Sequence, residues 1–92
     1  MVYDSSYDYK FISEYEFNEK YLLSKTDGSR YTKCILSSYE VEEIISSGNN
    51  FDSDYIEKYY YKINDRCFIK YKSNIKFRND NEEIKKFLEN LH

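Results

Sequence analysis

The sequence CFIKYKSNIKF, residues 67–77, decides the expected fold because its side chains alternate in character. Apolar side chains hold most of the odd positions, whereas lysines hold most of the even ones. Successive side chains of a strand point to opposite faces of a sheet, so this period of two predicts a strand with one buried face. The residues expected to point inward are Cys67, Ile69, Tyr71, Ile75 and Phe77.

A second predicted strand, Tyr59–Ile63, precedes this stretch and forms a hairpin with it. The length of the connecting loop decides which faces meet, because a slip of one residue exchanges the two faces of a strand. A two-residue loop would turn the tyrosines to the charged face. The apolar pattern therefore favours a three-residue loop, Asn64–Arg66, which sets Ile63, Tyr61 and Tyr59 opposite Cys67, Ile69 and Tyr71.

The N-terminal region from Tyr3 to Leu23 also alternates, with aromatic residues at many of its odd positions. The run is too long for one ordinary strand, so it predicts two strands with a bend near Ser13. A helix over Glu14–Ser24 is the alternative, because Ser13 and Glu16 have the spacing of a capping box.

Asp27-Gly28 lies between Tyr21–Leu23 and Tyr31–Leu36, and this dipeptide is typical of a tight hairpin turn. The predicted hairpin pairs Leu23 with Thr32 and Tyr21 with Cys34.

Two helices are expected to follow the hairpins. The first begins at Ser37, which forms a capping box with Glu40, and ends at Gly48; its apolar stripe is Val41, Ile44 and Ile45. Residues 49–54 then read as a polar loop. The second helix is capped by Asp80, and its stripe is Ile84, Phe87, Leu88 and Leu91.

These elements predict an α+β fold with one domain over residues 1–92. The expected order is two strands, a hairpin, a helix, a second hairpin and a second helix. The hairpins form a small antiparallel sheet, and both helices pack on one of its faces.

Residues suited to catalysis, metal binding or cofactor binding are scarce. The one histidine, His92, ends the chain, so no positioned imidazole is expected as a general base. The sequence has no phosphate-binding glycine loop and no hydrolase motif, and two cysteines with a terminal histidine cannot complete a zinc site. Acidic pairs near a lysine, as in Glu83-Ile84-Lys85, would suit a metal-dependent nuclease, but such spacings are common in acidic chains. We therefore expect no catalytic residue, no metal and no cofactor.

Composition points to a bacterial or phage origin. Phe, Tyr, Met, Ile, Asn and Lys, whose codons are AT-rich, make up about half of the chain. No secretory signal and no membrane-spanning run is evident, so we expect the protein in the cytoplasm of a bacterial host cell. Cys34 and Cys67 are then expected to be free thiols.

Charge is distributed unevenly along the chain. Residues 1–57 carry twelve acids and five bases, whereas residues 58–92 carry nine bases and five acids. If the alternation holds, one basic sheet face with an aromatic side chain results, suited to a phosphate backbone and to stacking with a base. An ordinary solvated strand is the other interpretation. This predicted basic face comprises Arg66, Phe68, Lys70, Lys72, Lys76 and Arg78.

The acidic N-terminal region interleaves carboxylates with tyrosines, a combination suited to a protein interface. A row of carboxylates on a strand would imitate the phosphates of DNA and occupy a basic channel. The alternative is a solvated outer face. The predicted acidic contact set is Asp4, Asp8, Glu14 and Glu16.

In size and composition the chain resembles phage-encoded inhibitors of bacterial defence, such as anti-CRISPR proteins. The resemblance implies a non-enzymatic protein that binds a larger nucleic-acid-handling enzyme stoichiometrically and blocks its charged channel. The alternative function is a small single-stranded nucleic-acid-binding or regulatory domain that uses the basic face.

Overall fold

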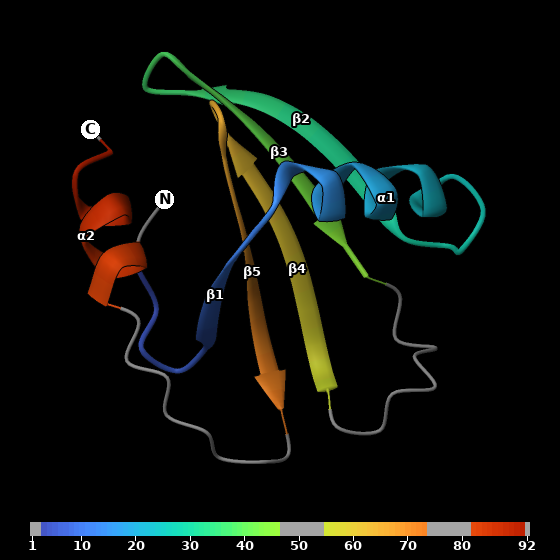
Figure 1. Ribbon diagram of the computed structural model, residues 1–92, viewed down its shortest axis with the longest axis horizontal. Coiled ribbons are helices and arrows are strands. Elements are labelled where there is room, and N and C mark those ends of the chain that lie inside the picture. Colours follow the sequence, from blue (N-terminus) through green and yellow to red (C-terminus); the bar gives the residue numbers. More distant parts are fainter. Residues whose placement is uncertain (1–2, 47–54, 74–81, 92) are drawn as a thin grey trace.

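The computed structural model describes residues 3–46, 55–73 and 82–91 (Figure 1). Its elements follow one another as strand, helix, four strands and helix. In chain order they are β1 (Asp8–Ile12), α1 (Glu14–Ser24), β2 (Arg30–Leu36), β3 (Tyr39–Ile45), β4 (Tyr55–Ile63), β5 (Arg66–Ser73) and α2 (Glu82–Glu89).

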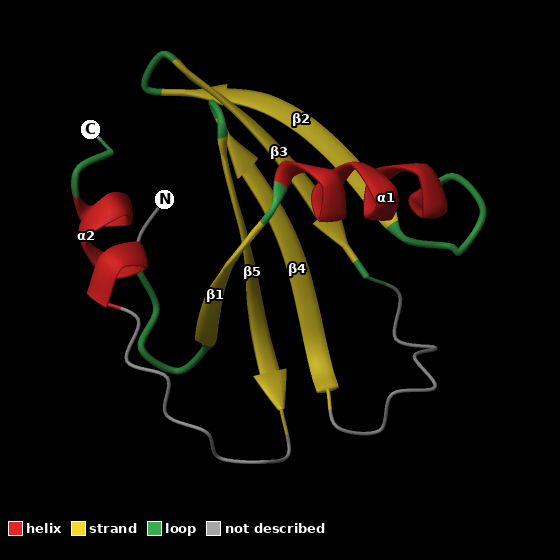
Figure 2. Cartoon of the chain, viewed as in Figure 1, coloured by secondary structure: helices red, strands yellow, loops and turns green. Residues whose placement is uncertain are grey.

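The five strands form one antiparallel sheet in the order β1-β5-β4-β3-β2 (Figure 2). The first strand of the chain therefore pairs with the last one, and β2 forms the opposite edge. The expected α+β fold with an antiparallel sheet and two helices is confirmed. The order of its elements differs from the expected one in the first half of the chain.

The chain changes from strand to helix at Ser13. The backbone of Ser13 is extended, and its hydroxyl accepts the backbone N–H of Glu16 at 3.1 Å, which makes it the N-cap of α1. The prediction of a second strand here is wrong, and the alternative helix over Glu14–Ser24 is confirmed. The cap satisfies a backbone donor that would otherwise be unpaired, and the helix buries Phe17, which is 1% exposed.

The Asp27-Gly28 turn connects α1 to β2 and forms no hairpin. Gly28 has a φ of 83°, so the dipeptide does turn the chain. The predicted pairing of Tyr21 and Leu23 with the following strand is wrong, because both residues belong to α1. The strand Tyr31–Leu36 itself is confirmed as β2.

A tight hairpin stands where a helix was predicted from Ser37. Ser37 and Ser38 have φ values of 49° and 71°, the positive pair that a type I′ turn requires, and Leu36 pairs with Tyr39 across it. Asn and Gly are the residues most typical of this turn, so the Ser37-Ser38 sequence did not indicate a hairpin. In β3, Val41 and Ile44 are buried on opposite faces of the sheet, and this burial overrides the short helical stripe.

The β4–β5 hairpin confirms both predicted strands, but its loop is one residue shorter than expected. Ile63 pairs with Arg66, so only Asn64 and Asp65 form the turn. Asn64 has a φ of 56°, which asparagine tolerates well. As a result, Tyr61 pairs with Phe68 instead of Ile69. The predicted residues 74–77 of this strand and the loop over 49–54 lie outside the described residues.

Both faces of the sheet are covered, each by one helix. Ile84 and Leu88 of α2 pack with Phe68, whereas Phe17 of α1 packs with Cys67. Because Cys67 and Phe68 are neighbours on one strand, they point to opposite faces. The two helices therefore lie on opposite faces of the sheet, and the prediction that both pack on one face is wrong. Coverage of both faces explains why Cys67, Phe68 and Ile69 in succession are 3%, 0% and 8% exposed.

Candidate functional site

The residues of the predicted basic face do share one side of β5, but they do not form an exposed surface. Arg66, Phe68 and Lys70 share one face of β5, as the alternation required. Phe68, however, is fully buried between Tyr61 at 5.2 Å and Phe87 at 6.4 Å, measured between ring centroids. It cannot stack on a base, because α2 covers this part of the sheet. Lys76 and Arg78 lie outside the described residues.

Arg66 is held against aromatic rings at the α2 end of the same face. Its guanidinium lies 4.4 Å from the ring centre of Phe11 and 5.8 Å from that of Phe87. These are cation–π distances, and they anchor the side chain beside the core although the residue itself is exposed.

Farther along β5 two lysines share a tyrosine ring. The ammonium of Lys70 lies 4.2 Å from the ring centre of Tyr7, and that of Lys72 lies 4.7 Å from it. Tyr59 meets Tyr7 edge-to-face at 6.1 Å and lies 5.5 Å from the Lys70 ammonium. All four side chains are half-buried. We call these residues, Tyr7, Tyr59, Lys70 and Lys72, the tyrosine–lysine cluster.

Asp4 lies beside this cluster and not on a separate acidic surface. Its carboxylate accepts the hydroxyl of Ser6 at 2.6 Å and the backbone N–H of Ser6 at 2.9 Å. These bonds lower the pKa of Asp4, and the charges of Lys70 and Lys72 lower it further. Asp4 therefore partly neutralises the predicted basic face.

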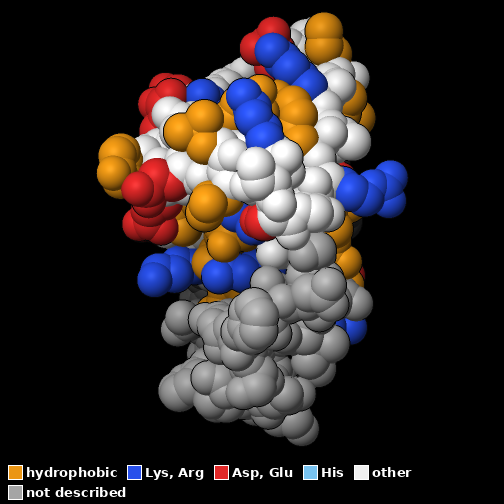
Figure 3. Space-filling view, turned by 90° about the vertical axis from the view of Figure 1, so that its right-hand side faces the viewer, with side chains coloured by type: hydrophobic (Ala, Val, Ile, Leu, Met, Phe, Trp, Pro, Cys, Tyr) orange, Lys and Arg blue, Asp and Glu red, His pale blue; other side chains and the backbone are white. Residues whose placement is uncertain are grey.

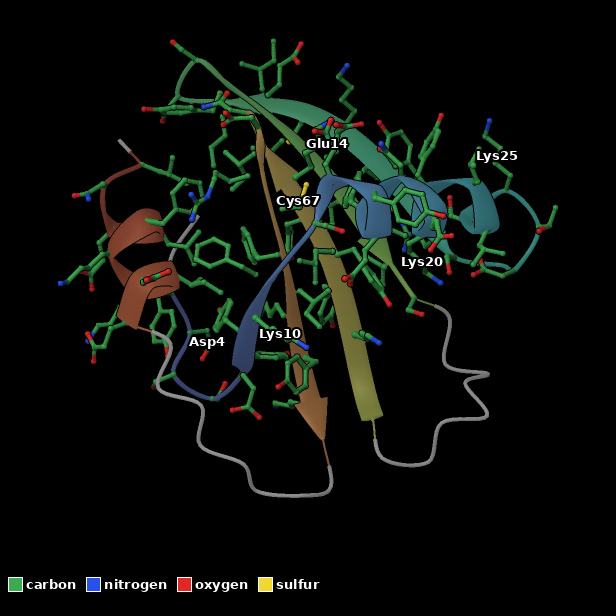
Figure 4. The ribbon with its side chains drawn as sticks, viewed as in Figure 1. Asp4, Lys10, Glu14, Lys20, Lys25 and Cys67 are labelled. Atoms are coloured by element: carbon green, nitrogen blue, oxygen red, sulfur yellow. The ribbon has the colours of Figure 1, made fainter. Side chains whose placement is uncertain are left out.

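The other predicted acids are dispersed. Asp8 is half-buried in β1, and burial raises its pKa. Glu14 accepts a hydrogen bond from the ammonium of Lys62 at 3.0 Å, which raises the pKa of that lysine. Glu16 is exposed on α1. Figure 4 shows Asp4 beside the lower part of β1 and Glu14 at the start of α1. No single strand carries the predicted row of carboxylates, because the chain turns into α1 after Ser13.

A surface that the sequence analysis did not predict lies on α1. Tyr15, Glu19 and Leu22 are spaced by four and seven residues and so share one side of the helix, opposite Phe17. Tyr15 is 70% exposed and Leu22 is 61% exposed. A hydrogen bond between Tyr15 and Glu19 raises the pKa of the tyrosine. We call Tyr15, Glu19 and Leu22 the α1 outer face. The helical spacing was visible in the sequence once residues 14–24 are considered as a helix.

The inner side of α1 is fixed to the sheet by polar and aromatic contacts. The ammonium of Lys20 lies 2.7 Å from the carboxylate of Asp27 and 5.6 Å from the ring centre of Tyr60. Tyr21 meets Tyr31 edge-to-face at 4.7 Å. The hydrogen bond from Lys20 lowers the pKa of Asp27 to about 2. These contacts hold the outer face in place although few apolar side chains of α1 are buried.

Among the described residues, every large apolar side chain that is strongly exposed lies on α1 or β2. Figure 3 shows the molecule from the side that is on the right in Figure 1, and apolar side chains reach this surface between charged ones. The set comprises Tyr15, Leu22, Leu23, Ile35 and Leu36. Isolated exposed apolar residues are ordinary, but a concentration on two adjacent elements is typical of an interaction surface.

Within residues 3–46, 55–73 and 82–91, no three His, Cys, Asp or Glu side chains are grouped so that they could hold a metal ion. Neither of the described helices has the length and apolar character needed to cross a membrane. No protein-family model matches the chain, and no curated protein or solved structure is significantly similar to it.

Proposed function

We propose that the protein acts without catalysis by binding a larger protein through the α1 outer face. The observation that carries this proposal is the exposure of Tyr15 and Leu22, at 70% and 61%, on the side of α1 opposite the buried Phe17. A helix that presents a tyrosine and a leucine one above the other matches the way amphipathic helices dock into the grooves of partners. Tyrosine is favoured at such contacts because it buries a large area at a low cost in side-chain entropy.

The acidic residues around the α1 outer face indicate what kind of partner surface would fit it. Glu16 and Glu19 flank the exposed apolar side chains, and both are exposed themselves. Glu14 is paired with Lys62, so it contributes less charge to an external contact. An apolar centre with an acidic rim fits a partner with an apolar groove and basic edges. Such a complex is expected to weaken as salt is added, because screening acts on the charged rim.

The finer proposal is an inhibitor encoded by a phage or another mobile element. The net charge of −3 and the AT-rich composition suit a small protein that occupies the basic channel of a bacterial nucleic-acid-handling defence enzyme. Its place of action would be the cytoplasm of the host. Of the predicted acidic contact set, Glu16 is the member with the best placement for this role, because it is exposed beside Tyr15.

The test is an affinity purification from a low-GC bacterial host, followed by mass spectrometry and by reconstitution with the recovered partner. Wild-type protein is expected to form a stoichiometric complex. The double variant Tyr15→Ser/Leu22→Ser is expected to bind at least about tenfold more weakly, since losing about 1.4 kcal/mol of contact energy already has that effect. The matched control is Lys85→Ser on the exposed side of α2. Equal binding by the double variant, or no partner at all, would contradict the proposal.

The alternative function, single-stranded nucleic-acid binding, retains one supporting observation. The tyrosine–lysine cluster places two ammonium groups over one half-buried tyrosine ring, so Tyr7 takes the aromatic role that Phe68 cannot fill. Fluorescence anisotropy with single-stranded DNA and RNA at low salt tests it. Lys70→Glu is expected to abolish binding and Lys85→Glu to leave it unchanged. If wild-type protein does not bind at low salt, this alternative is wrong.

A further inference from the structure

The two edges of the sheet differ in how they are protected. β1 has five residues, contacts α2, and carries the buried Tyr9. β2 has seven residues, pairs with β3 alone among the strands that the structure describes, and is exposed at every residue except Tyr31. Ile35 is 74% exposed and Leu36 is 41% exposed, and these neighbours point to opposite faces of the strand. A strand with apolar side chains on both faces and an open edge is a template for pairing with another strand.

The hairpin turn fixes which backbone groups point away from the sheet. Ser37 and Ser38 form a two-residue turn, so Leu36 and Tyr39 form the hydrogen-bonded pair next to it. Even-numbered residues of β2 therefore direct their N–H and C=O groups toward β3. The outward backbone groups belong to Tyr31, Lys33 and Ile35.

We propose that two copies of the protein associate through β2. The strands would pair antiparallel about a two-fold axis perpendicular to the sheet, so that two five-stranded sheets become one continuous sheet. The two-fold axis passes through the Cys34 pair. We expect the partner strand to come from a second copy of the chain. In this register the outward backbone groups of Lys33 and Ile35 pair with those of Ile35 and Lys33 of the other copy.

Charge and turn geometry select this register among the neighbouring ones. A two-fold axis of this kind sets one residue opposite the same residue of the other copy. Near the middle of the exposed strand that residue is Lys33, Cys34 or Ile35. An axis at Lys33 sets two ammonium groups directly opposite each other, which destabilises a sheet. An axis at Ile35 sets Lys33 opposite Ser37, which belongs to the turn and cannot extend the ladder. An axis at Cys34 pairs Lys33 with Ile35 and Thr32 with Leu36. It keeps the two lysines apart, and only the outer residue Tyr31 falls opposite Ser37.

The paired strands would shield the apolar side chains that the single chain leaves in water. Each Ile35 and Leu36 would gain a cross-strand neighbour from the partner copy, and such pairs stabilise a sheet. The α1 outer face takes no part in this contact. Self-association and the proposed binding of a larger protein can therefore fail independently of each other.

Sedimentation equilibrium of the full chain across a range of concentrations tests the proposal. Wild-type protein is expected to approach twice the monomer mass of 11.3 kDa. Lys33→Pro is expected to stay monomeric, because proline removes an outward N–H donor and leaves the β2–β3 ladder intact. Lys33→Ser, which loses the charge but keeps the donor, is the matched control and is expected to dimerise. Circular dichroism checks that both variants keep the fold.

Cysteine oxidation tests the register. Cys34 is exposed and would face its own copy at a position without mutual hydrogen bonds, where the side chains are closest, whereas Cys67 is buried. A mild oxidant is expected to trap a covalent dimer of wild-type protein and of Cys67→Ser, but not of Cys34→Ser. A monomeric wild type, or a Lys33→Pro variant that still dimerises, would overturn the proposal. A dimer that Cys34 cannot trap would overturn the register.

Discussion

The two helices cover the two faces of one sheet, yet they do so by different means. α2 buries Ile84 and Leu88, and Phe87 and Leu91 pack beside them, so its apolar stripe faces the large aromatic core. α1 buries Phe17 and Ser24 and leaves Tyr15, Leu22 and Leu23 in water. The α2 side of the sheet is stabilised by burial. The α1 side has a smaller buried cluster, Phe17 with Ile44 and Cys67, and keeps apolar surface free.

The magnitudes support this distinction. Full burial of a leucine, isoleucine or phenylalanine side chain stabilises a fold by roughly 1.5–3 kcal/mol. An N-cap such as Ser13 contributes about 1 kcal/mol, and an exposed ion pair contributes roughly 0–1 kcal/mol. The exposed side chains of α1 therefore contribute little to stability, and this surface can change without unfolding the chain. This combination suits a region whose role is contact with a partner.

The largest expected effect compares one substitution on both helices. Leu88→Ala is expected to lower the free energy of unfolding by about 2–5 kcal/mol, because Leu88 is 2% exposed and its truncation leaves a cavity. Leu22→Ala is expected to change it by less than about 0.5 kcal/mol, since Leu22 is mostly in water. Urea unfolding followed by circular dichroism measures both. Similar losses for the two variants would remove the distinction between the helices.

A smaller effect is expected at the β2–β3 turn. Ser37 and Ser38 both have positive φ, a conformation that Asn and Gly occupy at lower cost. The double variant Ser37→Asn/Ser38→Gly is expected to raise the free energy of unfolding by about 1 kcal/mol. Ser5→Gly, at an exposed position without positive φ, is the control and is expected to be slightly destabilising. A destabilised double variant would contradict the type I′ assignment.

The smallest expected effect concerns pH and the Lys20–Asp27 ion pair behind α1. The pKa of Asp27 falls from 3.8 to about 2 in the folded chain, mainly through the hydrogen bond from Lys20. Because the folded pKa is the lower one, the stabilisation is complete above pH 3.8 and is lost as pH falls toward 2. Solvent screening limits it to below about 1 kcal/mol. The difference in stability between wild type and Asp27→Asn is therefore expected to shrink over this interval. A difference that stays constant down to pH 2 would show that the ion pair is not its source.

The candidate site was only partly predictable. Lys70 and Lys72 share a face as the alternation indicated, but the aromatic beside them in space is Tyr7, far away in sequence. The acidic set was read as a strand face, and the helix that begins after Ser13 dispersed it. The exposed side chains of α1 and β2 were not predicted, because exposure of a leucine depends on what packs above it and not on its neighbours in sequence.

Local pattern by itself determined β4, β5 and α2, because a period of two or a continuous apolar stripe specifies an element wherever it packs. The tertiary structure alone decided the faces of those strands, since one residue fewer in the Asn64-Asp65 turn inverts every side chain of one strand relative to its partner. It also decided that Tyr39–Ile45 is a strand. In the interior of a sheet covered on both sides, neither face has to be polar, so the alternation that would have revealed β3 is missing.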